Sequence, residues 1–169
     1  SSVGALVGGL YAAGVPISSL ISMLPTLNWR SFTSFHLSKR GMVSSARIQS
    51  LVESFVGKMP IKDCSTPFIA TVTNLVMGEP VCFSNSDDRL SLILRASCSF
   101  PGVFSPVKIG DDYYVDGGVF HNLPVQPLKT FGVARTIGVD VIPFSALDNQ
   151  PKNIPLMVDR ALDLMLKEQ

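Results

Sequence analysis

The first four residues, Ser1-Ser2-Val3-Gly4, place hydroxyl groups in front of an apolar segment that is rich in Ala, Leu and Gly. A nucleophile elbow consists of a strand, a sharp turn with an exposed serine, and a helix. Gly4 stands two residues after Ser2, where a side chain is expected to collide with the incoming strand, so Ser2 is the candidate nucleophile. The Val3 N–H and the amino end of the helix would face an oxyanion beside Ser2. The same residues also fit an ordinary helix with a serine N-cap.

A serine nucleophile needs a base, and the sequence offers Asp116 and two histidines. Asp116 ends a predicted strand in the stretch YYVDGGVFHNLPV, where Gly117 and Gly118 let the main chain turn tightly and pass close to another segment. Asp-Gly-Gly is also a common turn sequence. His121 fits a partly exposed loop better than a Ser-His-Asp triad, and His36 has no carboxylate close in sequence, but the triad stays open as an alternative.

These two segments need a scaffold of helices and strands to bring them together. Apolar periodicity predicts helices over residues 4–13, 16–24, 47–56, 88–99 and 155–169, with Gly14 and Gly57 as stops and Asp87 or Asp88 as a cap. Strands are predicted at 67–75 and 78–84, around a Gly110-Asp111 turn, and as a buried parallel strand at 134–142. The pattern predicts a single layered α/β/α domain over residues 1–169 with a mixed, mainly parallel sheet.

Composition narrows the function classes. The chain has 169 residues, of which 46% are hydrophobic and 16% charged, and its net charge is +1, which argues against disorder and against nucleic-acid binding. The sequence contains no run of 18 apolar residues, so it predicts no membrane span. The odd, widely spaced cysteines Cys64, Cys82 and Cys98 match no metal or disulfide pattern and are expected to be buried thiols in a reducing compartment.

Two blocks of the sequence carry a family resemblance. SSVGALVGGLYAAG resembles the elbow and helix of the patatin-like phospholipases, and RASCSFPGVFSPVKIGDDYYVDGGVFHNLPV resembles their second signature block. PFIATVTNLVMGEPVCFS is similar to their central strand pair, although Asn74 stands where an Asp is common. The resemblance covers residues 1 to about 141, with both blocks in the family's order.

The resemblance implies a lipid acyl hydrolase with a Ser2–Asp116 dyad and no metal or organic cofactor. Val3 and Gly4 would belong to the elbow and oxyanion site, while Gly117, Gly118 and Asn122 would support the loop after Asp116. The substrate would be a phospholipid or another acyl ester. The aromatic cluster around Trp29 would be either a flap over the acyl groove or core packing.

The resemblance also points to machinery outside this sequence. The family's glycine-rich oxyanion loop and the first strand lie upstream of the elbow, so the 169-residue piece is expected to have little activity on its own. A cytoplasmic or peripheral membrane location is expected. A non-catalytic lipid-binding or regulatory relative and a Ser-His-Asp esterase remain the alternatives.

Overall fold

The computed structural model of the chain describes residues 1–23, 25 and 44–141. The predicted flap around Trp29, His36 and the predicted helix at 155–169 lie outside the described residues. The helices described are α1 (Ser2–Ala12), α2 (Ile17–Met23), α4 (Ala46–Val56) and α5 (Leu90–Ser97), with short 3-10 turns η2 (Ile61–Asp63), η3 (Gly117–Val119) and η4 (Gln126–Phe131). The strands are β1 (Ala70–Asn74), β2 (Glu79–Phe83), β3 (Val107–Ile109) and β4 (Asp112–Asp116).

The four described strands form one sheet in the order β2-β1-β4-β3, and every neighbouring pair is antiparallel. Both predicted hairpins are confirmed: β1 pairs with β2, and β3 pairs with β4 around Gly110, which has a φ of 61°. The α/β class is confirmed, but the prediction of a mainly parallel sheet is wrong for the described strands. The two strands of a hairpin are always antiparallel. Because the two hairpins also meet through an antiparallel pair, β1 with β4, no described strand has a parallel neighbour.

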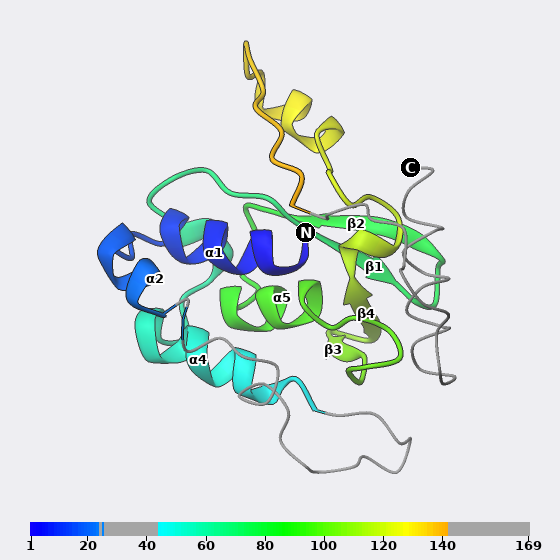
Figure 1. Ribbon diagram of the computed structural model, residues 1–169. Helices are drawn as coiled ribbons and strands as arrows, with labels where there is room; N and C mark the ends of the chain where they lie inside the picture. The colour runs from blue at the N-terminus through cyan, green and yellow to red at the C-terminus, as the bar shows by residue number, and fades with distance from the viewer. Residues whose placement is uncertain (24, 26–43, 142–169) are drawn as a thin grey trace, which may run out of the picture.

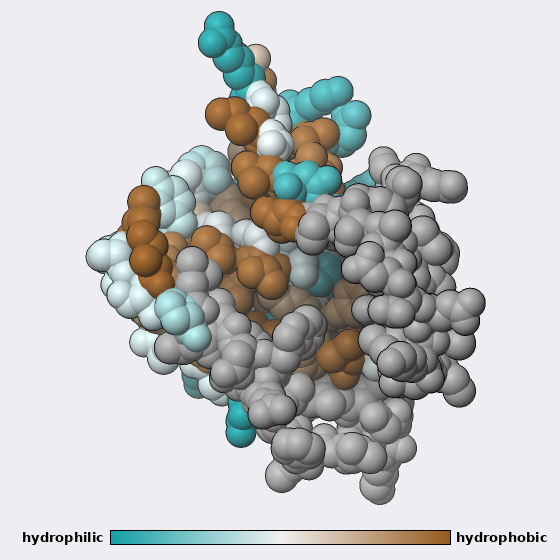
Figure 2. Space-filling view, in the orientation of Figure 1, coloured by the Kyte–Doolittle hydropathy of each residue, from teal (hydrophilic) through white to brown (hydrophobic). Residues whose placement is uncertain are grey.

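The predicted parallel strand at 134–142 is also wrong over its described residues, 134–141, which form no strand. This segment and η4 project from the rest of the molecule (Figure 1), and Figure 2 shows hydrophobic side chains along the projection. Ile137 is 90% exposed and Val141 is 79% exposed. A strand needs a neighbour for its backbone hydrogen bonds, and no described strand lies beside this one.

The helix stops fall where the sequence predicts them, but the cap of α5 does not. Gly14 follows α1 with a φ of 91°, and Gly57 ends α4 with a φ of 63°. The N-cap of α5 is Arg89, not Asp87 or Asp88. Asp87 is paired with Lys62, and the Asp88 carboxylate accepts a hydrogen bond from Ser86, so both carboxylates have partners outside the helix.

Helix α5 lies between the sheet and the other helices, with contacts to β1, β3 and β4 on one side and to α1 and α4 on the other (Figure 1). Its apolar side chains Leu90, Ile93, Leu94 and Ala96 have no exposed surface. A Cβ at Gly9 of α1 would lie 2.8 Å from Leu94 Cδ2, so this glycine allows α1 to approach α5 closely. That approach brings the first residues of α1 to the last residues of α5.

Candidate active site

Ser2 begins α1 in a strained conformation. Its φ is 52°, and it is the one residue other than glycine with a positive φ in the part of the chain that the structure describes. A left-handed conformation costs an L-residue about 1–2 kcal/mol, so neighbouring contacts must hold it. The Ser2 N–H donates to Ser97 Oγ (3.1 Å), and the Cys98 thiol donates to the Ser2 carbonyl (3.2 Å). Ser2 itself is only partly buried.

Asp116 ends β4, where it pairs with Val72 of β1, and it is 1% exposed. Its N–H donates to the Ser99 carbonyl (3.0 Å), and its carbonyl accepts from Thr73 Oγ1 (3.0 Å). Its carboxylate Oδ1 accepts the Gly118 N–H (2.8 Å). The other oxygen, Oδ2, accepts no hydrogen bond from the described residues although it is buried. An unpaired buried carboxylate oxygen is costly and needs an explanation.

The fold brings Ser2 and Asp116 together. Burial raises the pKa of the Asp116 carboxyl, and this rise is opposed by the Gly118 N–H, by the Ser2 hydroxyl and by the amino group of Ser1. The two side chains are therefore neighbours, but the Ser2 hydroxyl completes no hydrogen bond to Oδ2. Such contacts between nucleophile and base are often loose without substrate and tighten in the complex. The catalytic roles of the two residues stay predictions.

The glycines after Asp116 have different surroundings. A Cβ at Gly117 would lie 2.3 Å from the Thr71 carbonyl oxygen, a contact that only glycine avoids. A Cβ at Gly118 would lie 3.2 Å from Asp116 Oδ1, the oxygen that the Gly118 N–H binds. Gly117 is thus the glycine that lets the chain pass close to another main-chain segment, and Gly118 is the glycine that contacts the Asp116 carboxylate.

Ser1 and Asn122 connect the two ends of the site. The Ser1 hydroxyl donates to the Asn122 carbonyl (3.1 Å), which ties the start of α1 to the loop after Asp116. Asn122 is predicted to support this loop, and in this contact it acts through its main-chain carbonyl rather than through its side chain. Ser1 therefore also takes part in the site.

Val3 and Gly4 lie at the exposed amino end of α1, and Val3 is 57% exposed. The first hydrogen bond of the helix runs from the Ala5 N–H to the Ser1 carbonyl (3.1 Å), so the N–H groups of Val3 and Gly4 precede the regular ladder. A Cβ at Gly4 would meet no atom within 4 Å. No described strand lies against that turn, so the predicted steric need for Gly4 stays a prediction.

Of the two candidate histidines, only His121 lies among the described residues. His121 is exposed, and its N–H donates to the Gly117 carbonyl (3.0 Å). Across residues 1–23, 25 and 44–141, no cluster of three His, Cys, Asp or Glu side chains could hold a metal ion. The three cysteines are free, but only Cys98 is buried, while Cys64 is half-buried and Cys82 is exposed, so the expectation that all three are buried is wrong.

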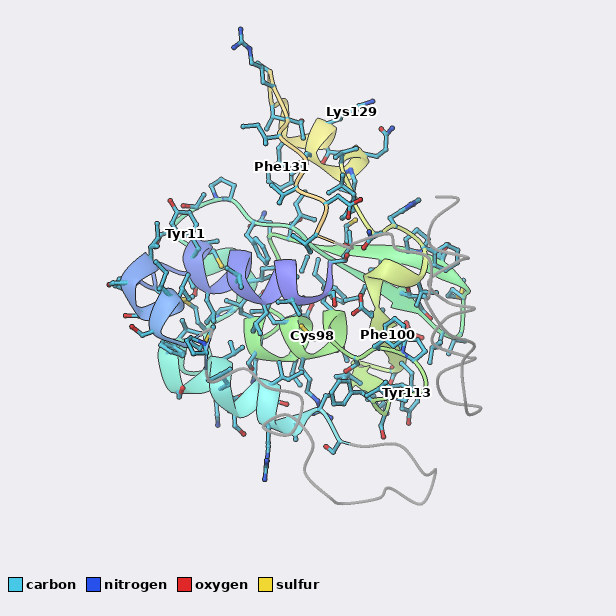
Figure 3. All side chains as sticks on the ribbon, in the orientation of Figure 1. Tyr11, Cys98, Phe100, Tyr113, Lys129 and Phe131 are labelled. Atoms are coloured by element: carbon cyan, nitrogen blue, oxygen red, sulfur yellow. The ribbon has the colours of Figure 1, made fainter. Side chains whose placement is uncertain are left out.

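The sequence reasoning missed the roles of Ser97 and Cys98. Figure 3 shows Cys98 at the carboxyl end of α5, beside the first turn of α1. Both residues contact Ser2 across more than ninety positions of the chain. No local pattern signals such contacts, since serine and cysteine at a helix end have many other uses.

Surface hollows lie elsewhere on the molecule. One of about 490 Å³ lies between α2 and α4, and one of about 430 Å³ lies beside residues 61–68. Neither is lined by Ser2 or Asp116. No helix in the described ranges is both long and apolar enough to cross a bilayer.

Comparison with known proteins shows which family the chain resembles. The model of the family described as patatin-like phospholipase matches residues 1–129. An uncharacterized NTE family protein of Mycobacterium tuberculosis is 30% identical over 144 residues, which cover 83% of this chain and 39% of that protein. The lysophospholipase NTE1 of Candida glabrata is 31% identical over 157 residues, or 83% of this chain and 8% of that protein. The lysophospholipase NTE1 of Scheffersomyces stipitis is 28% identical over 159 residues, or 90% of this chain and 10% of that protein. The chain thus spans well under half the length of these curated relatives.

Proposed function

Because this chain belongs to the patatin-like phospholipase family, we propose that it carries the Ser-Asp dyad of a serine lipid acyl hydrolase, with Ser2 as nucleophile and Asp116 as base. The observation that carries the proposal is the meeting of two unusual groups. Ser2 is strained and partly exposed at the amino end of a helix, and it neighbours a buried carboxylate with an unpaired oxygen. Strain of this kind collects at functional sites, where surrounding structure maintains it.

The reaction would run in two halves. The Ser2 hydroxyl oxygen attacks the ester carbonyl carbon while its proton passes to Asp116 Oδ2, and the tetrahedral intermediate collapses as that proton moves to the leaving alcohol. An acyl group then remains on Ser2. A water molecule gives its proton to Asp116 and attacks the acyl carbon, which releases the fatty acid and returns the proton to Ser2.

Burial of Asp116 supports its role as base. A carboxylate with the ordinary pKa of aspartate is too weak a base to take a proton from serine effectively. A raised pKa makes the Asp116 carboxylate a stronger base and so better able to accept the Ser2 proton. The N–H groups of Val3 and Gly4, with the helix dipole behind them, are suited to bind the negative oxygen of the intermediate.

The relatives narrow the substrate. Two yeast relatives are named lysophospholipases, so we propose a lysophospholipid or phospholipid ester as the substrate, reached at a membrane surface by peripheral contact. The reaction as written requires no metal or organic cofactor.

The test is fluorophosphonate labelling and lysophospholipid hydrolysis with the full-length gene product. Ser2→Ala should abolish labelling, and Asp116→Asn should lower the labelling rate about 10²–10⁴-fold because the general base is lost. Asp112→Asn, at the other end of β4, is the matched control and should label normally. An unlabelled wild-type protein would support the non-catalytic alternative. Loss of activity in His121→Ala or His36→Ala would support the Ser-His-Asp alternative.

A further inference from the structure

The carboxyl end of α5 binds both members of the proposed dyad through three consecutive residues. Ser97 Oγ accepts the Ser2 N–H (3.1 Å), Cys98 Sγ donates to the Ser2 carbonyl (3.2 Å), and the Ser99 carbonyl accepts the Asp116 N–H (3.0 Å). Ser97 and Ser99 have no exposed surface, and Cys98 is 8% exposed. The segment Ser97–Ser99, which we call the clamp, is therefore buried between the start of α1, which carries Ser2, and the end of β4, which carries Asp116.

The contacts to Ser2 hold its peptide groups on both sides. The Ser97 hydroxyl accepts from Ser2 and donates to the Thr71 carbonyl (2.8 Å), so its hydrogen and one lone pair are both used and its orientation is fixed. The Cys98 thiol points at the carbonyl on the other side of Ser2. Burial raises the pKa of this thiol, so it keeps the hydrogen that it donates.

Resting on the proposed function, we infer that Ser97 and Cys98 are positioning residues that hold Ser2 in its left-handed conformation, with its hydroxyl beside Asp116. A serine at the start of a helix would otherwise relax to a negative φ, because the left-handed region is unfavourable for residues with a Cβ. Relaxation would turn the hydroxyl to another direction while leaving the substrate surface in place. The clamp should therefore affect the rate of acylation more than substrate binding.

The experiment compares Ser97→Ala and Cys98→Ala with Ser91→Ala in the full-length gene product. Ser91 is the matched control because it lies on the same helix, is 1% exposed, and donates its hydroxyl to Glu53 (2.9 Å) away from Ser2. Each clamp variant should lower kcat and the fluorophosphonate labelling rate about tenfold or more, with KM within about threefold of wild type. Ser91→Ala should lose thermal stability without that loss of rate. Cys98→Ser, which restores a donor, should recover most of the rate.

Equal rates for the clamp variants and Ser91→Ala would overturn the inference. A second readout is independent of activity: a crystal structure of the Ser97→Ala, Cys98→Ala double variant should show Ser2 with a negative φ, and a retained φ near 52° would also overturn it. A wild-type protein that is neither labelled nor active would refute the proposed function, while the φ of Ser2 in the double variant would still decide whether the clamp holds this residue.

Discussion

The main chain of Gly117 lies against the main chain of Thr71, and replacing its hydrogen by a methyl group tests how closely the site is built. A Cβ there would lie 2.3 Å from the Thr71 carbonyl oxygen and 2.6 Å from its carbon, whereas ordinary contact begins near 3.4 Å. Roughly 1 Å of main-chain movement is therefore needed. The same carbonyl accepts the Ser97 hydroxyl, so the shift would reach the contacts of Ser2.

We predict that Gly117→Ala lowers the free energy of unfolding by about 2–3 kcal/mol, the upper part of the range for overpacked sites, because backbone cannot move aside as a side chain can. That loss corresponds to roughly 5–10 °C in Tm for a domain of this size. Displacement of Asp116 by about 1 Å should also slow serine labelling by up to about 10²-fold. Thermal unfolding and fluorophosphonate labelling measure the two effects.

Gly8→Ala, in α1, is the matched control, since its Cβ would lie 3.4 Å from Phe68 Cε2, an ordinary contact, and alanine favours a helix. It should leave Tm unchanged or slightly raised. If Gly117→Ala were as stable and as reactive as Gly8→Ala, the argument from close approach at Thr71 would be refuted.

Four further predictions follow from the burial and the strain described above. Because burial raises the pKa of Asp116 above 3.8 and the base must be ionised, the acid limb of kcat/KM should have its midpoint above that value, and a midpoint at or below it would contradict the assignment. The same raised pKa means that the folded protein is destabilised as pH rises through it, so Asp116→Asn should raise Tm at neutral pH, with the gain vanishing near pH 3 in a melting series. Ser2→Gly should increase the free energy of unfolding by about 1 kcal/mol while abolishing labelling, because glycine relieves the left-handed strain; an unchanged stability in urea titration would argue against strain. Iodoacetamide should modify Cys82 in the native protein and spare Cys98 until unfolding, as mass spectrometry of peptides would show; early Cys98 modification would contradict its burial.

Much of the fold was predictable because its signals are local. The β1–β2 and β3–β4 hairpins follow from runs of β-branched and aromatic residues around short turns, and Gly110 takes the positive φ that its turn needs. Gly14 and Gly57 end their helices for the same conformational reason. Signals of this kind depend on a few neighbouring residues and survive whatever the rest of the chain does.

Pairing between distant segments was not predictable in the same way. The apolar run at 134–141 has the composition of a parallel strand, but a strand exists only where a partner lies beside it. Asp87 has the right side chain to cap α5, yet it binds Lys62 instead. The contacts of Ser97 and Cys98 with Ser2 depend on how α1 packs on α5, which no short pattern encodes.

The strand order has a consequence for the order in which parts of this protein fold. Each hairpin closes over a few residues, while β1 and β4 join across more than forty positions, as in the pairing of Val72 with Asp116. Short loops close faster than long ones, so the two hairpins should form early and their union late. A nascent or half-assembled chain would hold the Asp116 carboxylate far from the Ser2 hydroxyl, so the two groups would meet only when the sheet is complete.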